Sequence, residues 1–502
     1  MAELLLGIDI GTFETKGVLV DASGAVRARA RRRHGIATPA PGWVEHDADA
    51  VWWADFAAVA RELTAAVGPG DRIAGVGASG IGPCVLPVDA DLRPLRPAIL
   101  YGVDTRAQAE IDELTELLGE DELLRRSGNV LTSQSSGPKV LWIERHEPEV
   151  AARARWYLTC ESYLVARLSG EVVMDRATAG YFHPLYDAAA DEWAADLAGI
   201  VAREKLPRLA WSHEVVGRVT DAAAAETGIP AGTPVVAGAA DAPSEALAAS
   251  VASPGDMMLM YGSSTFMIRV ADRPISDRVL WSAPFLFPGT YVVAAGTSTA
   301  GTATRWVCDA LGLDPAAGDD ALFAELVALA STSPPGARGV LALPHLSGER
   351  TPVHDPDARG AFVGISLDTD RGDLARALIE GIAHSVAHAL DAYESAALRP
   401  DRLVAIGGGT KNPILTQTVS DLTGLAQEVA DSDGAALGDA ILAALGVGLV
   451  ASPRDAAAWI RMRDGVTPGD AAGPLRTDHA DYVELYRALA PLNARRASRR
   501  TP

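Results

Sequence analysis

An aspartate and a Gly-Thr turn separate two apolar runs near the start of the chain, from Leu4 to Val20 (LLLGIDIGTFETKGVLV). Short β-prone runs split by such a turn predict a hairpin, and Asp9 falls where the first strand ends. Free N–H groups at a Gly-rich turn can hold phosphate oxygens, and a carboxylate beside them can hold Mg²⁺ directly or through water. The stretch therefore suits a metal-bound polyphosphate, although an ordinary edge hairpin would carry the same residues.

The same arrangement recurs later in the chain. Residues 256–270 (DMMLMYGSSTFMIRV) again predict a strand, a Gly-Ser-Ser-Thr turn and a strand, and residues 234–241 (PVVAGAAD) predict an apolar strand ending at Asp241. Residues 403–412 (LVAIGGGTKN) predict a strand, three glycines and the start of a helix. Together these features predict an α/β protein of two actin-like (ribonuclease H-like) ATPase domains, with the active site in the cleft between them.

Asp241 stands where a general base would be expected. It follows an apolar strand and has no cation near it in the sequence, so its carboxylate can be partly desolvated and more basic. An alternative interpretation is a helix N-cap with Glu245 nearby, and the two roles are compatible.

Motifs along nearly the whole chain resemble those of the FGGY carbohydrate kinases, and the xylulokinase branch more than the glycerol kinase branch. The resemblance runs from Leu4 to about Val450. Each motif is weak alone, but the set in this order is highly specific. The segments that carry it are DIGTFETK (Asp9–Lys16), KVLWIERH (Lys139–His146), AGAAD (ending at Asp241), LSGERTPVHDPDARGAFVGIS (Leu346–Ser366), DLARALIEGIAH (Asp373–His384) and GGGTKNP (Gly407–Pro413).

The resemblance implies a kinase that transfers the γ-phosphate of ATP to a hydroxyl of a ketopentose, with D-xylulose as the first candidate and with ATP and Mg²⁺ as cofactors. Asp241 is the implied catalytic base, and Asp9 is the second catalytic residue, holding Mg²⁺ through water. Lys16 adds charge near the phosphates or is an ordinary surface lysine. The implied nucleotide contacts are Gly11, Thr12, Lys16, Gly262, Ser263, Ser264, Gly301, Arg305, Gly408, Gly409 and Asn412.

The acceptor side departs from the family pattern. Glycerol kinases usually have an Arg-Glu pair, and xylulokinases a Met-His pair, where this chain has Gly82-Pro83. Glycerol kinases place a Tyr where Gln134 falls, and both branches usually have Asn or Gln where Ala242 follows the base. The first difference argues against glycerol, and the missing Met-His pair weakens the case for D-xylulose. The remaining candidate substrate contacts are Ser79, Gly82, Pro83, Asp104, Gln134 and Asp241, where Asp104 could instead cap a helix.

Other functions stay open at this point. The chain could phosphorylate another ketose or a polyol, such as ribulose or a tetrose, or it could be a regulator that binds ATP and sugar without turnover. A DNA-binding regulator would usually carry a helix-turn-helix module, for which we expect no room before the first hairpin. An Hsp70-like chaperone ATPase would carry an appended peptide-binding domain, which the sequence does not indicate.

Composition narrows the class of protein. The 502 residues carry a net charge of −21, which argues against nucleic acid or an anionic membrane as partner, because both favour a basic surface. The three cysteines are odd in number and far apart, so we expect no disulfide framework and a reducing cytoplasm. We expect no signal peptide, and no apolar run reaches about 18 residues. The expected partners are a small sugar and MgATP, and a second copy of the chain is a further candidate.

Composition breaks predict three segments: an N-terminal domain at 1–250, a C-terminal domain at 251–455, and a helical segment with a basic tail at 456–502. Residues 494–502 are expected to be disordered. A GxGxxG at Gly75, Gly77 and Gly80 is rejected as a dinucleotide site, because a strand and turn follow it rather than a helix. The spacing of His384 and His388 suits a metal, but no third ligand is evident, so we expect packed or surface histidines.

Overall fold

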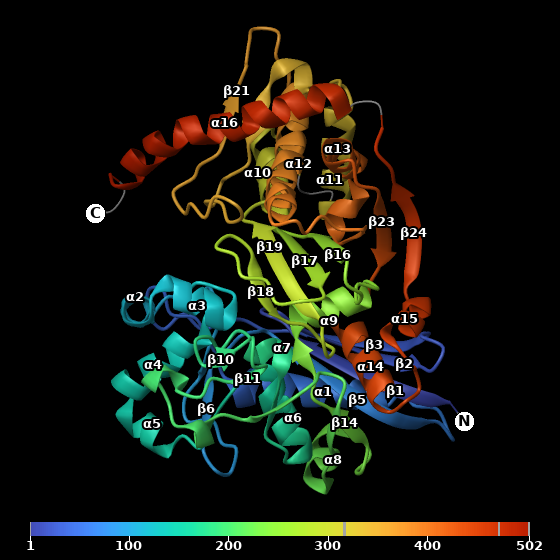
Figure 1. The fold of residues 1–502 in the computed structure, drawn as a ribbon. Coiled ribbons are helices and arrows are strands. Elements are labelled where there is room, and N and C mark those ends of the chain that lie inside the picture. Colours follow the sequence, from blue (N-terminus) through green and yellow to red (C-terminus); the bar gives the residue numbers. More distant parts are fainter. Residues whose placement is uncertain (1, 315–317, 470–471, 500–502) are drawn as a thin grey trace. The chain divides into compact units, whose positions relative to one another are not determined.

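The structure is a computed structural model, and it describes residues 2–314, 318–469 and 472–499 (Figure 1). The chain forms two compact units, each assembled from segments that are distant in the sequence. The first comprises Met1–Pro254, Val270–Val293 and Ser432–Arg461, and the second comprises Gly255–Arg269, Ala294–Asp431 and Met462–Pro502. Within the described ranges, no helix is both long and apolar enough to cross a membrane.

The first unit is built on a mixed sheet in the order β13-β14-β5-β1-β2-β3, with β15 also pairing with β5. The predicted N-terminal hairpin is present: β1 and β2 pair antiparallel, and β5 lies parallel to β1 on the other side. The strands are β1 (Glu3–Ile10), β2 (Glu14–Asp21), β3 (Val26–Arg33), β5 (Arg72–Gly80), β13 (Val215–Arg218), β14 (Pro234–Val236) and β15 (Ala239–Ala240).

The helices that pack against this sheet include α9 (Asp241–Ala248) and α14 (Ala435–Gly446), and glycines set how closely these two approach the sheet and each other. A methyl group at Gly7 on β1 would lie 2.0 Å from the backbone oxygen of Ala436. One at Gly77 on β5 would lie 2.1 Å from the oxygen of Asp439, and one at Gly438 would lie 1.9 Å from the oxygen of Ser244. The central glycine of the GxGxxG pattern thus admits a helix backbone against the sheet. As expected, the element after the pattern is a strand, β6 (Leu86–Val88), and not a helix.

The rest of the first unit consists of shorter elements. Its small strand pairs are β4 (Glu45–His46) with β7 (Ala98–Ile99), β6 (Leu86–Val88) with β8 (Trp156–Leu158), β9 (Val173–Asp175) with β12 (Arg208–Ala210), and β10 (Tyr186–Asp187) with β11 (Glu192–Trp193), and β18 spans Trp281–Pro284. Its other helices are α1 (Ala54–Thr64), α2 (Gln108–Leu118), α3 (Glu120–Ser127), α4 (Ser136–His146), α5 (Pro148–Arg153), α6 (Cys160–Ser169), α7 (Arg176–Ala179), α8 (Asp221–Thr227) and α15 (Pro453–Ala456).

The second unit repeats the plan of the first. Its strands run in the order β19-β17-β16-β22-β23-β24, with the predicted hairpin β16–β17 antiparallel and β22 parallel to β16. These strands are β16 (Asp256–Tyr261), β17 (Thr265–Ala271), β19 (Tyr291–Thr297), β22 (Arg402–Ile406), β23 (Gln427–Asp431) and β24 (Arg461–Val466), and a separate pair joins β20 (Leu341–Leu343) to β21 (Ala361–Val363).

In the described part of the second unit the α-helices are α10 (Gly301–Ala310), α11 (Asp319–Ala330), α12 (Arg371–Ser395), α13 (Pro413–Thr423) and α16 (Ala472–Ala497). The long α12 packs against α11, α13 and α16, and a capping box between Asp370 and Asp373 starts it. Because α16 continues to Ala497, the expected disorder from residue 494 onward is wrong for residues 494–497. Residues 500–502 lie outside the described residues.

Candidate active site

Asp9 is the next-to-last residue of β1, beside the Gly11–Thr12 turn, close to the strand end where the hairpin pattern predicts it. Its Oδ1 accepts a hydrogen bond of 3.0 Å from Ser79 Oγ, which lies opposite it on β5. Burial raises the pKa of Asp9 to about 6, against the lowering effects of Ser79, Lys16 and His34. The protein therefore compensates the charge of this carboxylate poorly, which suits a group that meets a bound cation.

The turn itself is fixed by short contacts. The N–H of Gly11 donates to the oxygen of Glu14 over 3.0 Å, and His34 Nε2 lies 3.0 Å from the oxygen of Gly11. The other ring nitrogen of His34 lies 3.0 Å from Asp55 Oδ2, so the imidazole joins the turn to α1. Lys16 lies beyond the turn with a side chain that is 53% exposed and 3.7 Å from Glu14.

Asp241 is the first residue of α9. The N-cap is Ala240, so the interpretation of Asp241 as the cap is wrong. Asp241 Oδ1 accepts a 2.8 Å hydrogen bond from the N–H of Ala242. Burial, and then the charge of Asp9, raise the pKa of Asp241 well above its usual range. Glu245, one turn later, has its pKa raised to about 7 by the same two causes.

A further carboxyl group, that of Asp439 on α14, joins Ser79, the partner of Asp9, to the helix that carries Asp241. The sequence had not predicted this residue. Ser79 Oγ lies 2.7 Å from Asp439 Oδ2, and Ser244 Oγ on α9 donates to Oδ1 over 2.9 Å. Asp439 is fully buried, and burial followed by the charge of Asp9 raises its pKa well above the usual range. A serine hydroxyl has one hydrogen, so a protonated Asp439 can donate to Ser79 while Ser79 donates to Asp9.

The candidate acceptor contacts fall in two places within the first unit. Ser79 contacts Asp9, and a methyl group at Gly82 would lie 2.8 Å from Ala240 Cβ, which places Gly82 and Pro83 beside the residue before Asp241. Gln134 Oε1 accepts a 3.3 Å hydrogen bond from the N–H of Gly102. Tyr101, the neighbour of Gly102, has its hydroxyl 3.5 Å from Thr12 Oγ1, so this loop contacts the turn of the first hairpin.

Asp104 is fully buried and its oxygens are occupied by protein groups. It accepts hydrogen bonds from the N–H of Val44 (2.7 Å), the N–H of Arg106 (3.1 Å) and the Arg106 guanidinium (2.7 Å). Arg106 also pairs with Glu45 over 2.8 Å and lies 4.1 Å above the ring of Trp43. Because α2 begins at Gln108 with no side-chain cap, the capping interpretation of Asp104 is wrong.

Lys139 of α4 joins the two loops that carry Asp104 and Gln134. Its ammonium donates to three backbone oxygens, those of Leu100 (2.7 Å), Tyr101 (3.0 Å) and Ser133 (2.7 Å). Burial lowers the pKa of Lys139 to about 8. All three hydrogens are used, so this lysine holds backbone rather than a ligand. The sequence had indicated Lys139 only as the first residue of the family motif KVLWIERH, without a role in holding loops.

In the second unit, a pocket with a volume of about 800 Å³ collects most of the predicted nucleotide contacts. Apolar side chains of α11 and α13 form one part of its wall, and Arg305, Asp319, Asp320 and Lys411 add charge. Ser264 is not among the lining residues; its backbone oxygen accepts a 2.9 Å bond from Gly262 in the hairpin turn. The predicted contacts that line the pocket are Gly262, Ser263, Gly301, Arg305, Gly408, Gly409 and Asn412.

Glycines bring three segments of the second unit together at this pocket. A methyl group at Gly301 would lie 2.8 Å from the oxygen of Gly262, and one at Gly409 would lie 2.6 Å from Tyr261 Cβ. A methyl group at Gly408 would meet nothing within 4 Å, so this glycine faces open space. Asn412 caps α13, with Oδ1 accepting from the N–H groups of Ile414 and Leu415 at 3.1 Å each.

Comparison with known proteins decides the family. The model of the N-terminal domain of the FGGY family of carbohydrate kinases matches residues 4–248, and that of its C-terminal domain matches residues 257–447. The chain belongs to the FGGY family. It is a carbohydrate kinase, a phosphotransferase with an alcohol group as acceptor. The two-domain α/β fold of these kinases, consistent with an actin-like ATPase, is confirmed. That the active site lies in the cleft between the domains stays a prediction, as do the roles of the site residues and the segment boundaries.

Several relatives span almost the whole chain. A xylulose kinase of Staphylococcus epidermidis is 29% identical over 493 residues, which cover 97% of this chain and 96% of that protein. The crystal structure of xylulose kinase from Rhodospirillum rubrum is 33% identical, with a TM-score of 0.91 over 98% of this chain and 100% of that one. A gluconokinase of Bacillus subtilis is 27% identical over 508 residues, covering 97% of this chain and 96% of that protein.

The donor set of this FGGY kinase fits a magnesium ion that arrives with ATP. In the described parts of the chain, no group of three or more His, Cys, Asp or Glu residues could hold a metal. Mg²⁺ commonly takes only one or two carboxylates and keeps water and phosphate oxygens as its other ligands. Asp9, beside a phosphate-type turn, fits that mode. His384 and His388 pack against His479 and Tyr482, as expected for packed histidines.

Proposed function

We propose that this chain is an ATP-dependent kinase of a ketopentose, with D-xylulose as the first candidate acceptor and MgATP as the phosphate donor. The observation that carries the chemistry is Asp241, at the start of α9, with a pKa raised by burial and by the charge of Asp9. A carboxylate made more basic in this way is suited to accept a proton from an alcohol. The choice of D-xylulose rests on the full-length similarity to proteins named xylulose kinase.

In the proposed reaction, Asp241 accepts the proton of the acceptor hydroxyl. That oxygen forms a bond to the γ-phosphorus, and the bond from the γ-phosphorus to the bridging oxygen breaks, so that ADP leaves. Ser79 and Asp439 hold the Asp9 carboxylate in place on one side, and Ser244 ties Asp439 to the helix that carries Asp241. When bound near Asp9, Mg²⁺ would supply positive charge that offsets the phosphates.

The pocket of the second unit is proposed to hold the adenosine part of ATP. Phe323, Val327 and Leu415 offer the apolar surface that a purine needs, and Gly408 leaves room for close approach. The N-terminus of α10 at Gly301 offers the positive end of a helix dipole to phosphate groups.

Gluconate is the second candidate acceptor, because a gluconokinase matches over nearly the same length. Its carboxylate would favour a cation in the acceptor site. Among the described residues near the candidate acceptor contacts, the buried cations Arg106 and Lys139 are already engaged, by Asp104 and Glu45 and by three backbone oxygens. This favours a neutral sugar over gluconate.

The test is release of ADP from MgATP across a panel of ketopentoses, tetroses, polyols, aldoses and gluconate, with Asp241→Ala measured in parallel. We expect one ketopentose to give strong turnover, lost in the variant. Strong turnover only with gluconate or a polyol would replace the proposed acceptor. Turnover that survives Asp241→Ala would remove this residue as the base, and ATP binding without any sugar-stimulated turnover would favour a regulator.

A further inference from the structure

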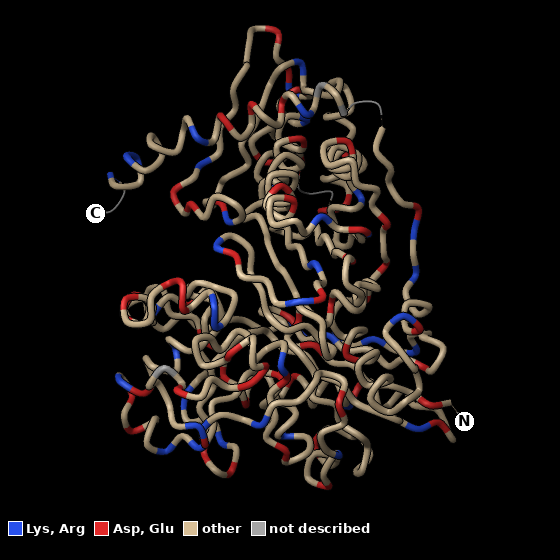
Figure 2. Tube along the Cα trace, viewed as in Figure 1, with Lys and Arg blue, Asp and Glu red and all other residues tan. Residues whose placement is uncertain are grey.

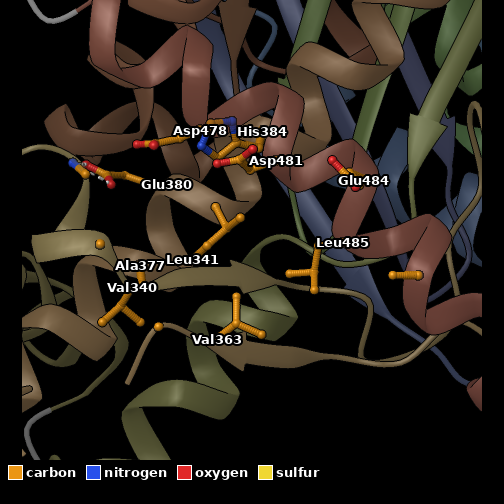
Figure 3. Close-up of a pocket in the computed structure, with 14 residues that line it drawn as sticks. Val340, Leu341, Val363, Ala377, Glu380, His384, Asp478, Asp481, Glu484 and Leu485 are labelled. Atoms are coloured by element: carbon orange, nitrogen blue, oxygen red, sulfur yellow. Dashed lines mark hydrogen bonds between the residues drawn. The ribbon is translucent and has the colours of Figure 1, made fainter. Parts of the chain in front are cut away.

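The second unit contains another cavity, with a volume of about 320 Å³, which shares no lining residue with the pocket proposed for adenosine. Leu341 on β20 and Val363 on β21 line it on one side, and side chains of α12 and α16 line it on another (Figure 3). None of the described lining residues is a lysine or an arginine. Figure 2 shows acidic residues in the first half of α16 and basic ones closer to its C-terminal end. The acidic residues that border the cavity are Glu380, Asp478, Asp481 and Glu484.

The protein compensates only one of these four carboxylates. Glu380 is held by Arg376 and by the N–H of Gly336. In the part of the chain that the structure describes, the three acids of α16 make no hydrogen bond and no ion pair. Asp478 Oδ2 lies 3.4 Å from the place that a methyl group on Gly336 would take, so this carboxylate is at the cavity wall. Burial, and then the charge of Asp481, raise the pKa of Asp478. The cavity therefore carries negative charge that the protein does not neutralise.

A neutral imidazole adds a hydrogen-bond acceptor to the same wall. His384 is 1% exposed, and burial, followed by the charge of His479, lowers its pKa to about 3. Its Nδ1 lies 3.2 Å from His479 Nδ1, and His479 Nε2 lies 3.0 Å from Asp391 Oδ2. Because a carboxylate can only accept, the hydrogen of the neutral His479 ring is on Nε2, and its Nδ1 must accept the hydrogen of His384 Nδ1. His384 Nε2 is therefore left with a lone pair.

This lone pair has no partner in the protein. His384 Nε2 makes no hydrogen bond to any described residue, and the ring lines the cavity close to Asp478 and Asp481 (Figure 3). Buried polar atoms nearly always have a partner, so the free acceptor points to a ligand with N–H or O–H donors. Within the described ranges no three such side chains are grouped closely enough to hold a metal ion. An ammonium group fits instead, because it combines a positive charge with three N–H donors.

We propose that this cavity is a binding site for an aliphatic diamine or polyamine, with an ammonium group between His384 Nε2 and the acids of α16. The carbon chain of such a ligand would lie along Leu341, Val363 and Leu485, which supply the apolar part of the wall. A volume of about 320 Å³ is sufficient for a short linear amine, since small-molecule pockets begin at roughly 300 Å³. The inference goes beyond the proposed kinase activity and does not depend on the acceptor or on catalysis.

Calorimetric titration with 1,4-diaminobutane tests the proposal directly. It is done at physiological ionic strength, where attraction between distant exposed charges is screened. We expect saturable binding to the natural chain, and binding that is about tenfold weaker or lost in Asp481→Asn with Glu484→Gln, because charge-assisted hydrogen bonds are removed. Glu325→Gln is the matched control: it removes an exposed acid of α11 away from the cavity and should bind the diamine as the natural chain does. The melting temperature of each variant checks that it is folded.

An ammonium group attached to the chain gives a second, independent test. Ala488 is exposed and lines the cavity, so Ala488→Lys should place its own ammonium beside the acids, raise the melting temperature and prevent binding of the diamine. Ala480→Lys adds the same charge to an exposed position of the same helix that does not line the cavity, and it should do neither. Four results would each overturn the proposal: no binding to the natural chain, unchanged binding in the double variant, unchanged binding in Ala488→Lys, or displacement of the diamine by an equal concentration of Mg²⁺.

Discussion

The two hairpins of this kinase share a backbone plan and differ in what stands at their turns. In β1–β2 the residue two positions before the turn glycine is Asp9, and the parallel neighbour β5 adds Ser79. In β16–β17 the same position is Met260, and the parallel neighbour β22 leads into the glycines at 407–409. One copy gathers buried acids, and the other opens a pocket of about 800 Å³. The same backbone plan therefore carries a group of acids in the first unit and a ligand-sized pocket in the second. Substitutions can test each of the two units separately.

The largest effect should come from the acids of the first unit. Asp241→Ala removes the proposed base, and we expect kcat to fall by about 10² to 10⁴-fold, the usual contribution of a general base, with the KM for ATP little changed. Steady-state kinetics with the best acceptor measures both.

Glu245→Gln is the matched control. Glu245 is a second acid on α9, with its pKa also raised by burial, but it has no proposed role in proton transfer. Its kcat should stay near that of the natural enzyme. A loss as large as that of Asp241→Ala would mean that the whole acid group, rather than one base, determines the rate.

Substitution of Asp439, which joins Ser79 to Ser244, should have the next largest effect on activity and stability. Asp439→Ala leaves the hydroxyls of Ser79 and Ser244 without their buried partner, and an unsatisfied buried polar group costs about 1–3 kcal/mol. We expect a lower denaturation midpoint together with a reduced kcat. Asp439→Asn keeps one acceptor and gains a donor at the same place, so it should restore most of both. If Asn is as damaging as Ala, the site needs the carboxyl group of Asp439 for more than its hydrogen bonds with the two serines.

Lys139 should affect acceptor affinity more than rate. Lys139→Met removes the three bonds that hold the loops of Asp104 and Gln134, and a loss of about 1.4 kcal/mol in binding corresponds to a tenfold rise in KM. We expect that rise for the sugar and no change for ATP, because Lys139 belongs to the first unit and the pocket to the second. Equal changes in both KM values would indicate general misfolding instead.

The glycines of the second unit offer a matched pair. Gly408→Ala adds a methyl group into open space, so the melting temperature should not change, but the KM for ATP should rise if a nucleotide packs there. Gly409→Ala would place its methyl group 2.6 Å from Tyr261 Cβ and should lower stability directly. A Gly408→Ala enzyme with an unchanged KM for ATP would contradict the assignment of this pocket to adenosine.

Regular local patterns in the sequence predicted the main strands and turns of the fold. They did not predict contacts between residues that are far apart in the sequence. Both hairpins and the glycine-rich turn followed from local periodicity, because turn residues and apolar alternation act within a few positions. Asp439 lies 360 residues from Ser79 within an alanine-rich helix, so nothing local identified it. The predictions that Asp104 and Asp241 cap helices were wrong, because the two helices begin within a few residues of the predicted positions but have other residues as N-caps. Exact helix starts depend on tertiary packing, which local patterns do not give.

The smallest effect near neutral pH is an acid sensitivity shared by both units. Burial lowers the pKa of His46 and His183 in the first unit to about 4, and that of His384 and His388 in the second to about 3 and about 4. An unfolded histidine titrates near 6.5, so below that pH the unfolded chain binds protons that the folded chain does not. The contribution of these four histidines to stability should therefore be complete above about pH 6.5 and be lost as the pH decreases toward about 4.

His384→Phe tests which unit limits this acid response. The variant keeps a ring against Tyr482 and removes one titrating group from the second unit, at the loss of the contact with His479. Urea midpoints at neutral pH and near pH 4.5 should show a smaller acid-induced drop than in the natural chain. His146→Gln, with a side chain that is 53% exposed, should leave the drop unchanged. If His384→Phe also leaves it unchanged, the first unit unfolds first in acid, because its own buried histidines then set the limit.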